Sequence, residues 1–467
     1  MSDGHWTWPR GQLDLLLRAV LTPDADAALA AARQWLDRNE IDSASFREHR
    51  LLASLAQRFG TEIADHPAGP RLAGLARHLW ARSQVAQREA AGALAALARD
   101  MPVMLIKGAS RSAADPQASR GRIAHDIDIL VRDGDMPAAL ASLLDRGWRH
   151  AGGASRLRLT AMLPESRAIN LGSGALGDID LHRDAYHAVN ASAEDEAGIW
   201  ARSQAVSYLG AAARIPHPSD RALLAIGHGA LDAHKHSDWL VDCGFALSHA
   251  AFDWDVFLRS AAARRLDAQA LIALGYLSGP VGLAVPREIL AGLSRAARRR
   301  PFGRVMASLQ AAPRENLSKP GHLMRGLAKL WRKGRDRRSG PAMAAPSIQA
   351  SARRAADGMP DGAMLSTAIR AGSESHIRLR LRVAYPAARR AVFEINAADR
   401  HVATLVMRNR SRTAQVLEAG FLVPVPASLR GKPLVIEARP SRLVRESANL
   451  PFRAVNDALP FALVEFG

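Results

Sequence analysis

Two aspartates spaced one residue apart, Asp126 and Asp128, stand in the apolar run IAHDIDILV and are the residues of this chain best suited to chemistry. In an extended strand from Ala124 to Val131, side chains alternate between the two faces, so both carboxylates would project from the same face. Like charges this close repel unless a cation lies between them, and hard divalent ions such as Mg²⁺ take oxygen ligands. An isolated pair with this spacing is more often a solvated strand edge, so the metal hypothesis needs further support.

A second pair of aspartates supplies part of that support. Asp178 and Asp180 repeat the same spacing in the segment GDIDLH at 177–182, which is a strand candidate. If this strand lies in the same sheet as the first, one of its carboxylates can face Asp126 and Asp128. Three converging carboxylates could hold two metal ions. Asp126 and Asp128, together with either Asp178 or Asp180, could therefore bind metal as one unit.

A small-residue turn upstream of the aspartates could bind phosphate. The segment LIKGAS runs from an apolar strand candidate into this turn, where Gly108 would let backbone amides approach a triphosphate. Lys107 would add a positive charge, and Ser110 follows two residues after the glycine. A Lys-Gly step alone is weak evidence, because it also occurs at ordinary loop and helix boundaries.

The histidines near these segments are expected to be structural. His182 is expected to point to the face of its strand opposite Asp180, and His125 is interpreted in the same way relative to Asp126. The group His228, His234, His236 and Asp242 resembles a zinc set. However, residues two apart on a helix are separated by about 200°, whereas ligands four apart would share a face. Packing, capping or contact with a nucleotide base is the preferred interpretation.

Hydrophobic periodicity indicates the elements that must position these residues. Residues 1–100 show helical spacing and are predicted to form a helical N-terminal region. Residues 101–218 change to short apolar runs separated by Gly, Ser and Pro, followed by a helical run, in the order β, loop, β, α. This pattern predicts an α/β core. Helical spacing resumes in residues 219–333.

The C-terminal part of the chain has a different pattern. Residues 334–375 are basic and rich in helix and strand breakers, which predicts a flexible linker. Residues 376–467 contain six short apolar runs separated by turn residues, which favours a β-sandwich-like accessory domain. The predicted fold class is therefore α+β, with helical N-terminal and middle regions and an all-β C-terminal domain.

Composition limits the class of protein. A chain of 467 residues with 48% apolar residues is typical of globular proteins with more than one domain, and no apolar run reaches the 18 residues of a membrane span. The N-terminus lacks the features of a secretory signal, so a cytoplasmic location is expected. The single cysteine, Cys243, excludes an internal disulfide framework and a multi-thiolate zinc site.

The net charge of +18 suggests a nucleic-acid partner, but the distribution of charge weakens that idea. Most of the basic residues are scattered arginines. The dense runs Arg295–Arg304 and Arg332–Arg338 contain few aromatic residues for base stacking and lie beside the breaker-rich stretch. A solvated basic linker is the simpler interpretation, and nucleic acid is not the expected partner.

Taken in order, LIKGAS, RIAHDIDILV, DIDLH and HGALDAHKHSDWLVD resemble the uncharacterised nucleotidyltransferases of the DNA polymerase β-like superfamily, over roughly residues 10–300. The phosphate loop departs from the pattern of the wider superfamily, which has Gly-Ser or Gly-Gly where this chain has Lys-Gly. The residues that carry the resemblance are Lys107, Gly108, Arg122, Asp126, Asp128, Asp180, Leu181, His182, His228, Trp239 and Asp242.

The resemblance implies a DNA polymerase β-like core that moves a nucleoside monophosphate from an NTP such as ATP to an acceptor hydroxyl, with release of pyrophosphate. It implies Mg²⁺ or Mn²⁺ as cofactor and an acceptor that is a small molecule, a peptide or a protein. Asp180 could also take the acceptor's proton. Arg122 could offset developing charge, although an arginine before a strand is more often a surface residue. The implied nucleotide-binding residues are Lys107, Gly108, Ser110 and Arg122, and the implied catalytic, metal-binding residues are Asp126, Asp128 and Asp180.

Two alternatives stay open at this point. A catalytically inactive relative could still bind nucleotide or a partner, since family membership does not guarantee activity. A nucleic-acid-binding protein that uses the basic linker is the other alternative, and a steep salt dependence of binding would identify it. The acceptor and the preferred NTP also stay open.

Overall fold

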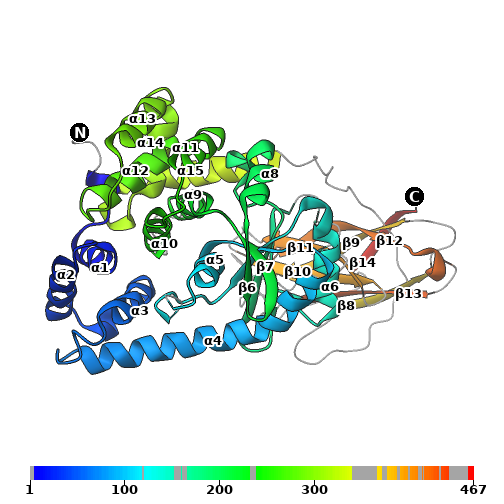
Figure 1. Cartoon of the computed structure of the whole chain (residues 1–467). Coiled ribbons are helices and arrows are strands. Elements are labelled where there is room, and N and C mark those ends of the chain that lie inside the picture. Colours follow the sequence, from blue (N-terminus) through cyan, green and yellow to red (C-terminus); the bar gives the residue numbers. More distant parts are fainter. Residues whose placement is uncertain are drawn as a thin grey trace. The chain divides into compact units, whose positions relative to one another are not determined.

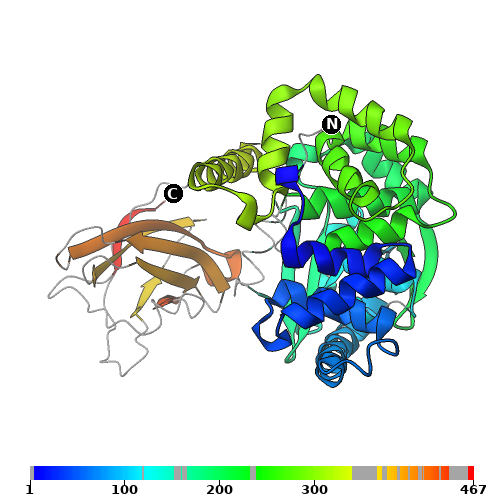
Figure 2. The ribbon, with the colours of Figure 1, turned by 90° about the vertical axis from the view of Figure 1, so that its left-hand side faces the viewer.

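The computed structural model (Figures 1 and 2) places the chain in two compact units, one formed by residues 1–148 and 166–340 and the other by residues 149–165 and 341–467. Each unit is described by itself. The structure describes all residues except 1–4, 118–119, 152–158, 160–162, 164–165, 232–237, 339–364, 371–375, 386–389, 398–399, 409–412, 414, 431–432, 441–460 and 467.

Amphipathic helices form the N-terminal region. Side chains define where they begin: Asp24 accepts a hydrogen bond from the amide of Ala27, and Ser45 and Glu48 cap one another's backbone amides in a capping box. The long last helix of this region carries a proline near its start, where the missing N–H has no helical partner in any case. The helices are α1 (Gly11–Leu21), α2 (Ala25–Arg38), α3 (Phe46–Phe59) and α4 (Gly69–Asp100).

A mixed seven-stranded sheet follows, in the order β3-β4-β5-β2-β1-β7-β6. At its centre β2 runs parallel to β5, while β1 is antiparallel to β2 and parallel to β7. The strands are β1 (Met104–Leu105), β2 (Ile127–Leu130), β3 (Arg149–His150), β4 (Ala168–Ser173), β5 (Gly177–His182), β6 (Gln204–Tyr208) and β7 (Ala211–Ile215).

The register of the central strands brings the predicted aspartates together. Asp128 on β2 pairs directly with Asp180 on β5, and Leu130 pairs with His182. The strand predicted from Ala124 to Val131 is shorter in the structure, so Asp126 precedes β2 rather than lying within it. The segment predicted as the second strand, 177–182, is β5 in full.

Helices cover the sheet, and Figures 1 and 2 show α1–α3 together with α9–α14 on one side of it. One hydrophobic cluster joins side chains from these helices, among them Leu16, Leu51 and Leu223, with Met104 and Leu130 of the sheet. The remaining helices are α5 (Lys107–Ala114), α6 (Met136–Asp145), α8 (Ala193–Arg202), α9 (Pro218–Gly229), α10 (Asp238–Leu247), α11 (Trp254–Ala263), α12 (Asp267–Ser278), α13 (Arg287–Arg298), α14 (Pro301–Ala311) and α15 (Lys319–Arg338).

The second unit contains two small antiparallel sheets, with strand orders β11-β10-β13-β8 and β12-β9-β14. One buried cluster includes Phe393 and Ile395 from the first sheet and Leu379 and Phe421 from the second. The strands are β8 (Leu365–Arg370), β9 (His376–Tyr385), β10 (Arg390–Ala397), β11 (Arg400–Arg408), β12 (Gln415–Pro424), β13 (Pro433–Pro440) and β14 (Phe461–Phe466).

The architecture is therefore α+β, as predicted, with a helical N-terminus, a mixed central sheet and antiparallel C-terminal sheets. Regular structure also enters the range 334–375 that the sequence predicts as linker, because α15 extends to Arg338 and β8 begins at Leu365. The predicted boundaries near residues 100, 218, 333 and 375 stay predictions. Among the described helices, none is long and apolar enough to cross a membrane.

Candidate functional site

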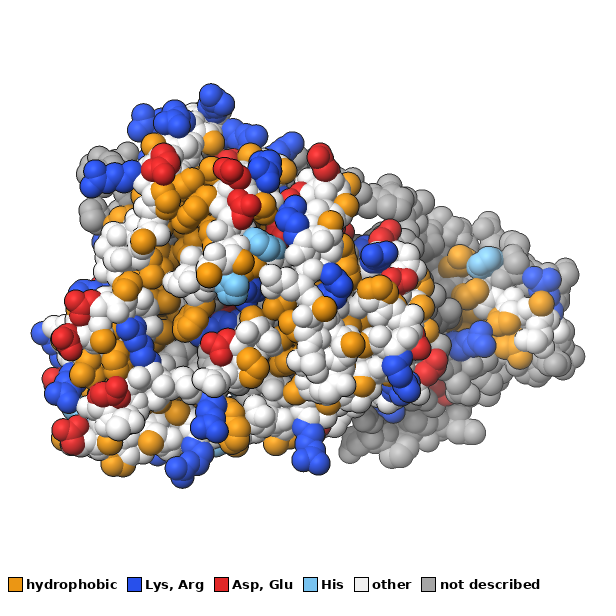
Figure 3. All heavy atoms as spheres, in the orientation of Figure 1, with side chains coloured by type: hydrophobic (Ala, Val, Ile, Leu, Met, Phe, Trp, Pro, Cys, Tyr) orange, Lys and Arg blue, Asp and Glu red, His pale blue; other side chains and the backbone are white. Residues whose placement is uncertain are grey.

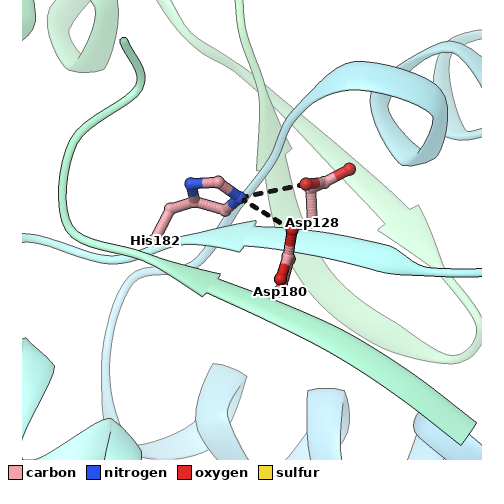
Figure 4. Close-up of side chains that lie close together, drawn as sticks. All are labelled: Asp128, Asp180 and His182. Carbon is pink, nitrogen blue, oxygen red and sulfur yellow. Dashed lines mark hydrogen bonds and ion pairs between the residues drawn. The ribbon is translucent and has the colours of Figure 1, made fainter. Parts of the chain in front are cut away.

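Asp128, Asp180 and His182 form a compact group at the centre of the sheet (Figure 4). His182 Nε2 lies 3.0 Å from Asp128 Oδ1 and 3.7 Å from Asp180 Oδ2. Asp128 and His182 are buried, whereas Asp180 keeps part of its carboxylate exposed. The parallel pairing of β2 with β5 is what brings these three side chains to one place, since they come from parts of the chain far apart in sequence.

The expectation that His182 points away from Asp180 is wrong. Residues two apart in a strand share a face, because the side-chain period of a strand is two. His182 therefore lies on the same side of β5 as Asp180, and its imidazole faces both carboxylates. Burial first, and then the positive charges of Lys107 and Arg167, lower the pKa of His182 well below its usual value, so the ring is neutral.

Lys107, the first residue of α5, places its ammonium group against these carboxylates. Its Nζ contacts Asp128 Oδ1 and lies 4.0 Å from Asp180 Oδ2. Burial alone would lower the pKa of Lys107, but attraction to Asp128, Asp180 and Asp126 outweighs burial and raises it. The residue also has a φ of 51°, in the left-handed region that side chains other than glycine rarely adopt. A lysine in a strained backbone conformation thus offsets part of the negative charge of the paired aspartates.

Asp126 and Asp178 lie near this group without belonging to it. Asp126 is half-buried in the bend before β2. Asp178 accepts a hydrogen bond of 2.6 Å from Asn170 Nδ2. Burial, together with repulsion from Asp126 and Asp180, raises the pKa of Asp178 to about 6 despite that hydrogen bond. The assignment of Asp126 as a metal ligand stays a prediction.

Arg122 is buried and paired, which rules out the alternative interpretation of a surface arginine. Its Nε and Nη2 each donate to the carboxylate of Asp242 at 2.8 Å, and its Nη1 lies 2.7 Å from Asp238 Oδ2. Burial opposes the charged form, but the two aspartates outweigh it and raise the pKa of Arg122 above its usual range. Both aspartates lie four residues apart on α10, which places them on one face of that helix.

Gly108 fits closely against Arg122. A Cβ atom added at Gly108 would lie 2.8 Å from Arg122 Nη2 and 3.0 Å from its Cζ, which is closer than real side chains approach. The glycine therefore lets the start of α5 pack on the guanidinium group. Ser110 lies one turn further along α5, is buried, and donates its hydroxyl to the carbonyl of Lys107 at 2.8 Å. Contacts of Lys107, Gly108, Ser110 and Arg122 with a nucleotide stay predictions.

Arg50 and Arg111 extend this ion-pair network. Arg50 Nε donates to Asp238 at 2.7 Å, and Arg111 Nη1 donates to Asp242 at 3.1 Å. The network therefore joins α3, α5, the segment before β2, and α10. We refer to these five residues, Arg50, Arg111, Arg122, Asp238 and Asp242, as the Arg–Asp network.

A pocket of about 400 Å³ opens between the Arg–Asp network and the carboxylates. Its lining combines charged side chains from both groups with histidines and apolar residues of α9 and α10. The lining residues are Arg50, Lys107, Gly108, Arg122, Ala124, Asp126, Asp128, Arg167, His187, Ala225, His228, Gly229, Leu231, Asp238, Trp239 and Asp242.

His228 lines the pocket but is engaged by the protein. Its Nε2 lies 2.7 Å from the carbonyl oxygen of Ala185, and its ring stacks on Tyr186. Burial lowers the pKa of His228 well below its usual value. His234 and His236 lie outside the described residues, so the zinc set considered from the sequence is not tested.

Residues that the sequence did not single out also hold the site in place. Arg167 Nη1 lies 3.5 Å from His182 Nδ1. Ser83 of α4 donates its hydroxyl to the carbonyl of Ala124 at 2.6 Å and so fixes the backbone just before Asp126. Glu89 of α4 accepts hydrogen bonds from the backbone amides of residues 175–177 in the turn between β4 and β5. These contacts join residues more than 10 positions apart, which local sequence patterns do not reveal.

The donor group fits a small divalent cation. Ligand atoms of Asp128, Asp180 and His182 lie within 4.8 Å of one another. Adjacent ligands of an ion with bonds of about 2.1 Å are separated by roughly 3 Å, close to the 3.0 Å between His182 Nε2 and Asp128 Oδ1. Two carboxylates suit Mg²⁺ and Mn²⁺, while an imidazole nitrogen shifts the preference toward transition metals.

Comparisons with known proteins agree with this chemistry. A family model described as an uncharacterised nucleotidyltransferase matches residues 44–279, a range that includes the carboxylates, His182 and the Arg–Asp network. Comparisons with curated proteins and with solved structures give no match. Since the family model covers just over half of the chain, this protein belongs to the uncharacterised nucleotidyltransferase family.

Proposed function

We propose that this protein transfers a nucleoside monophosphate from an NTP to an acceptor hydroxyl and releases pyrophosphate, on a core of the DNA polymerase β type. In the reaction, the bond between the α-phosphorus and the bridging oxygen of the leaving pyrophosphate breaks, and a new bond forms to the acceptor oxygen. The observation that carries this proposal is the direct pairing of Asp128 with Asp180, with His182 facing both carboxylates.

The carboxylates and His182 are the residues that would hold a divalent cation, Mg²⁺ or Mn²⁺. Such an ion, when bound, stabilises the negative charge of the phosphates and lowers the pKa of the acceptor hydroxyl. Asp180 is the partly exposed member of the group, and for this reason we assign it the role of accepting the hydroxyl proton. Asp126 lines the pocket and would be a further ligand of that cation.

The start of α5 would bind the triphosphate. The first backbone amides of a helix lack helical partners and attract anions, and those of Lys107 and Gly108 begin α5. Lys107 would move from the carboxylates to a phosphate when a divalent ion takes over its position. The donors of Arg122 are occupied by Asp238, Asp242 and a backbone carbonyl, so we assign Arg122 the role of positioning Gly108.

The acceptor in this proposal is a hydroxyl-bearing small molecule, peptide or protein. The pocket beside the carboxylates includes the aromatic ring of Trp239 and the guanidinium group of Arg167. An aromatic ring suits the face of a nucleotide base, and guanidinium groups suit phosphate or carboxylate oxygens. The pocket therefore has the chemistry to take the nucleotide and part of an acceptor.

An inactive relative that binds nucleotide without turnover is the second candidate. The ion pair between Lys107 and Asp128 favours it, because an ammonium group that stayed on the carboxylate would exclude a metal ion. The two candidates differ in their response to divalent ions. An active site must bind the ion at Asp128 and Asp180, whereas a site permanently neutralised by Lys107 does not.

The deciding experiment measures thermal unfolding with increasing Mn²⁺ or Mg²⁺, and then transfer of label from each NTP to components of a cell extract. At about 100 times the dissociation constant, the ion should stabilise the wild type by roughly 2.7 kcal/mol. Asp128→Asn and Asp180→Asn should lose this stabilisation. They should also lose transfer by more than the roughly 10- to 100-fold that outer-shell substitutions cost.

Asp65→Asn is the matched control, since the carboxylate of Asp65 is 81% exposed and lies away from the donor group. It should behave as the wild type in both assays. If the wild type shows no metal response and labels nothing, the nucleotidyl transfer proposal fails. Binding of NTP without any metal response and without transfer would favour the inactive relative, whose carboxylate stays paired with Lys107.

A further inference from the structure

The excess positive charge of this protein is concentrated in α13, α14, α15 and their connections. Residues 287–338 contain fifteen Lys and Arg against three Asp and Glu, a net charge of +12 out of +18 for the whole chain. Figure 3 shows Lys and Arg side chains gathered at the top of the view, over α13. This segment follows the part of the chain that the family model matches, so the enzyme family gives no account of it.

Within the same segment, α15 exposes a stripe of aliphatic side chains. Leu323, Leu327 and Leu330 are 66%, 51% and 67% exposed, and Met324 beside them is 47% exposed. The three leucines are spaced four and three residues apart, which places them on one face of the helix. Single exposed leucines are ordinary, whereas a row of them along one helix indicates an interaction surface.

The opposite face of α15 packs against the rest of the first unit. Ala328 is buried, and Arg325 donates from Nε to the carbonyl of Leu309 at 2.7 Å and from Nη2 to the carbonyl of Ala312. These contacts fix the rotation of the helix about its axis. Because the face with Ala328 and Arg325 packs against the first unit, the leucine stripe faces outward. On α14, Val305 adds a further exposed aliphatic side chain.

We propose that α13–α15 bind the surface of an anionic lipid bilayer, with the leucines of α15 entering the boundary between headgroups and acyl chains. A helix with an apolar stripe in a strongly basic setting has the composition of interfacial helices, whose cations attract acidic headgroups while the apolar face is buried. No described helix can cross a membrane, so the contact lies at the surface. Nucleic acid would satisfy the cations but would leave the leucines without a role.

Sedimentation of the full chain with lipid vesicles tests this proposal. Vesicles containing phosphatidylglycerol should carry the protein down, whereas pure phosphatidylcholine vesicles should bind at least tenfold less. The triple variant Leu323→Gln, Leu327→Gln, Leu330→Gln keeps every charge and should bind the anionic vesicles at least tenfold less than the wild type. Because the three side chains are exposed, its melting temperature should equal that of the wild type.

The control variant Val85→Gln, Val406→Gln changes exposed aliphatic residues outside this surface and should bind vesicles as the wild type does. Three results would overturn the proposal. The first is equal binding to both kinds of vesicle or to neither. The second is a triple variant that binds anionic vesicles as tightly as the wild type, which would reduce the contact to charge alone. The third is a dimeric wild type together with a monomeric triple variant. That result would show that the leucine stripe binds a second copy of this chain.

Discussion

The pocket of the first unit lies between two charged groups that are built differently. In the Arg–Asp network, three arginines surround two aspartates, and each carboxylate contacts two guanidinium groups. In the Asp128, Asp180 and His182 group, two carboxylates share a neutral histidine and a single ammonium group, with Asp126 and Asp178 close by. In the Arg–Asp network, positively charged side chains outnumber the carboxylates. In the carboxylate group, the carboxylates outnumber the positively charged side chains.

We interpret this difference as one between a structural role and the reactive role proposed above. Paired buried charges are costly to disturb, because removing one partner leaves the other uncompensated. A cluster of carboxylates with a deficit of positive charge gains by binding a cation. Substitutions in the Arg–Asp network should therefore affect stability first, and substitutions in the carboxylate group should affect ligand binding first.

The largest effect should come from Asp242→Asn, which tests the network side of the comparison. Arg111 and Arg122 would lose a shared charged partner in a buried setting, at a cost of roughly 3–5 kcal/mol in the free energy of unfolding. Urea unfolding followed by tryptophan fluorescence measures this loss.

The control for Asp242→Asn is Asp133→Asn. This variant removes an ion pair between Arg183 and Asp133, and the carboxylate of Asp133 is 80% exposed. It should cost no more than about 1 kcal/mol. A stable Asp242→Asn variant that has lost nucleotide binding would break the comparison, because the network would then belong to the reactive site.

A smaller effect is expected for Lys107→Met, which tests whether the lysine holds the place of a cation. Without the ammonium group, the carboxylates should bind Mn²⁺ about tenfold more tightly in the absence of nucleotide, a change of ~1.4 kcal/mol. The same variant should bind NTP more weakly, because a phosphate loses its cationic partner. Isothermal titration calorimetry measures both affinities.

Lys319→Met removes an exposed lysine from the start of α15 and should change neither affinity. Weaker Mn²⁺ binding by Lys107→Met would show that Lys107 supports the metal site rather than competing for it.

The smallest effect should come from Asp178→Asn. This variant tests whether Asp178 lies outside the metal-binding group. Asn170 can still donate to the remaining side-chain oxygen, and one repulsive charge near Asp126 and Asp180 is removed. We expect a change in unfolding free energy within about 0.5 kcal/mol and a retained thermal shift with Mn²⁺. Loss of the metal response in Asp178→Asn but not in Asp180→Asn would show that Asp178, and not Asp180, is the metal ligand.

Local sequence patterns predicted the elements of the site better than its contacts. Alternating and helical periodicity placed β5 and the helices around the sheet, and the repeated Asp spacing pointed to Asp128 and Asp180. His182 was misplaced, although the two-residue period of a strand puts it beside Asp180. The partners of Arg122 lie about 120 residues away on α10, and no local pattern connects them.

Asp126 shows a further limit of pattern analysis. An apolar run predicts a strand, but it does not fix the residue at which the strand begins. The structure begins β2 one residue after Asp126, so the two aspartates do not share the geometry of an extended pair. The ends of elements depend on tertiary contacts, here the hydrogen bond from Ser83 to the carbonyl of Ala124.

The parallel pairing of β2 with β5 also bears on how the protein folds. Asp128 and His182 are 54 positions apart in the chain, and a parallel pair cannot be closed by a tight turn. Contacts between such distant segments form late, because a long loop must first lose its conformational freedom. Under the proposed function, an ion bound between β2 and β5 would therefore report that these two strands have paired.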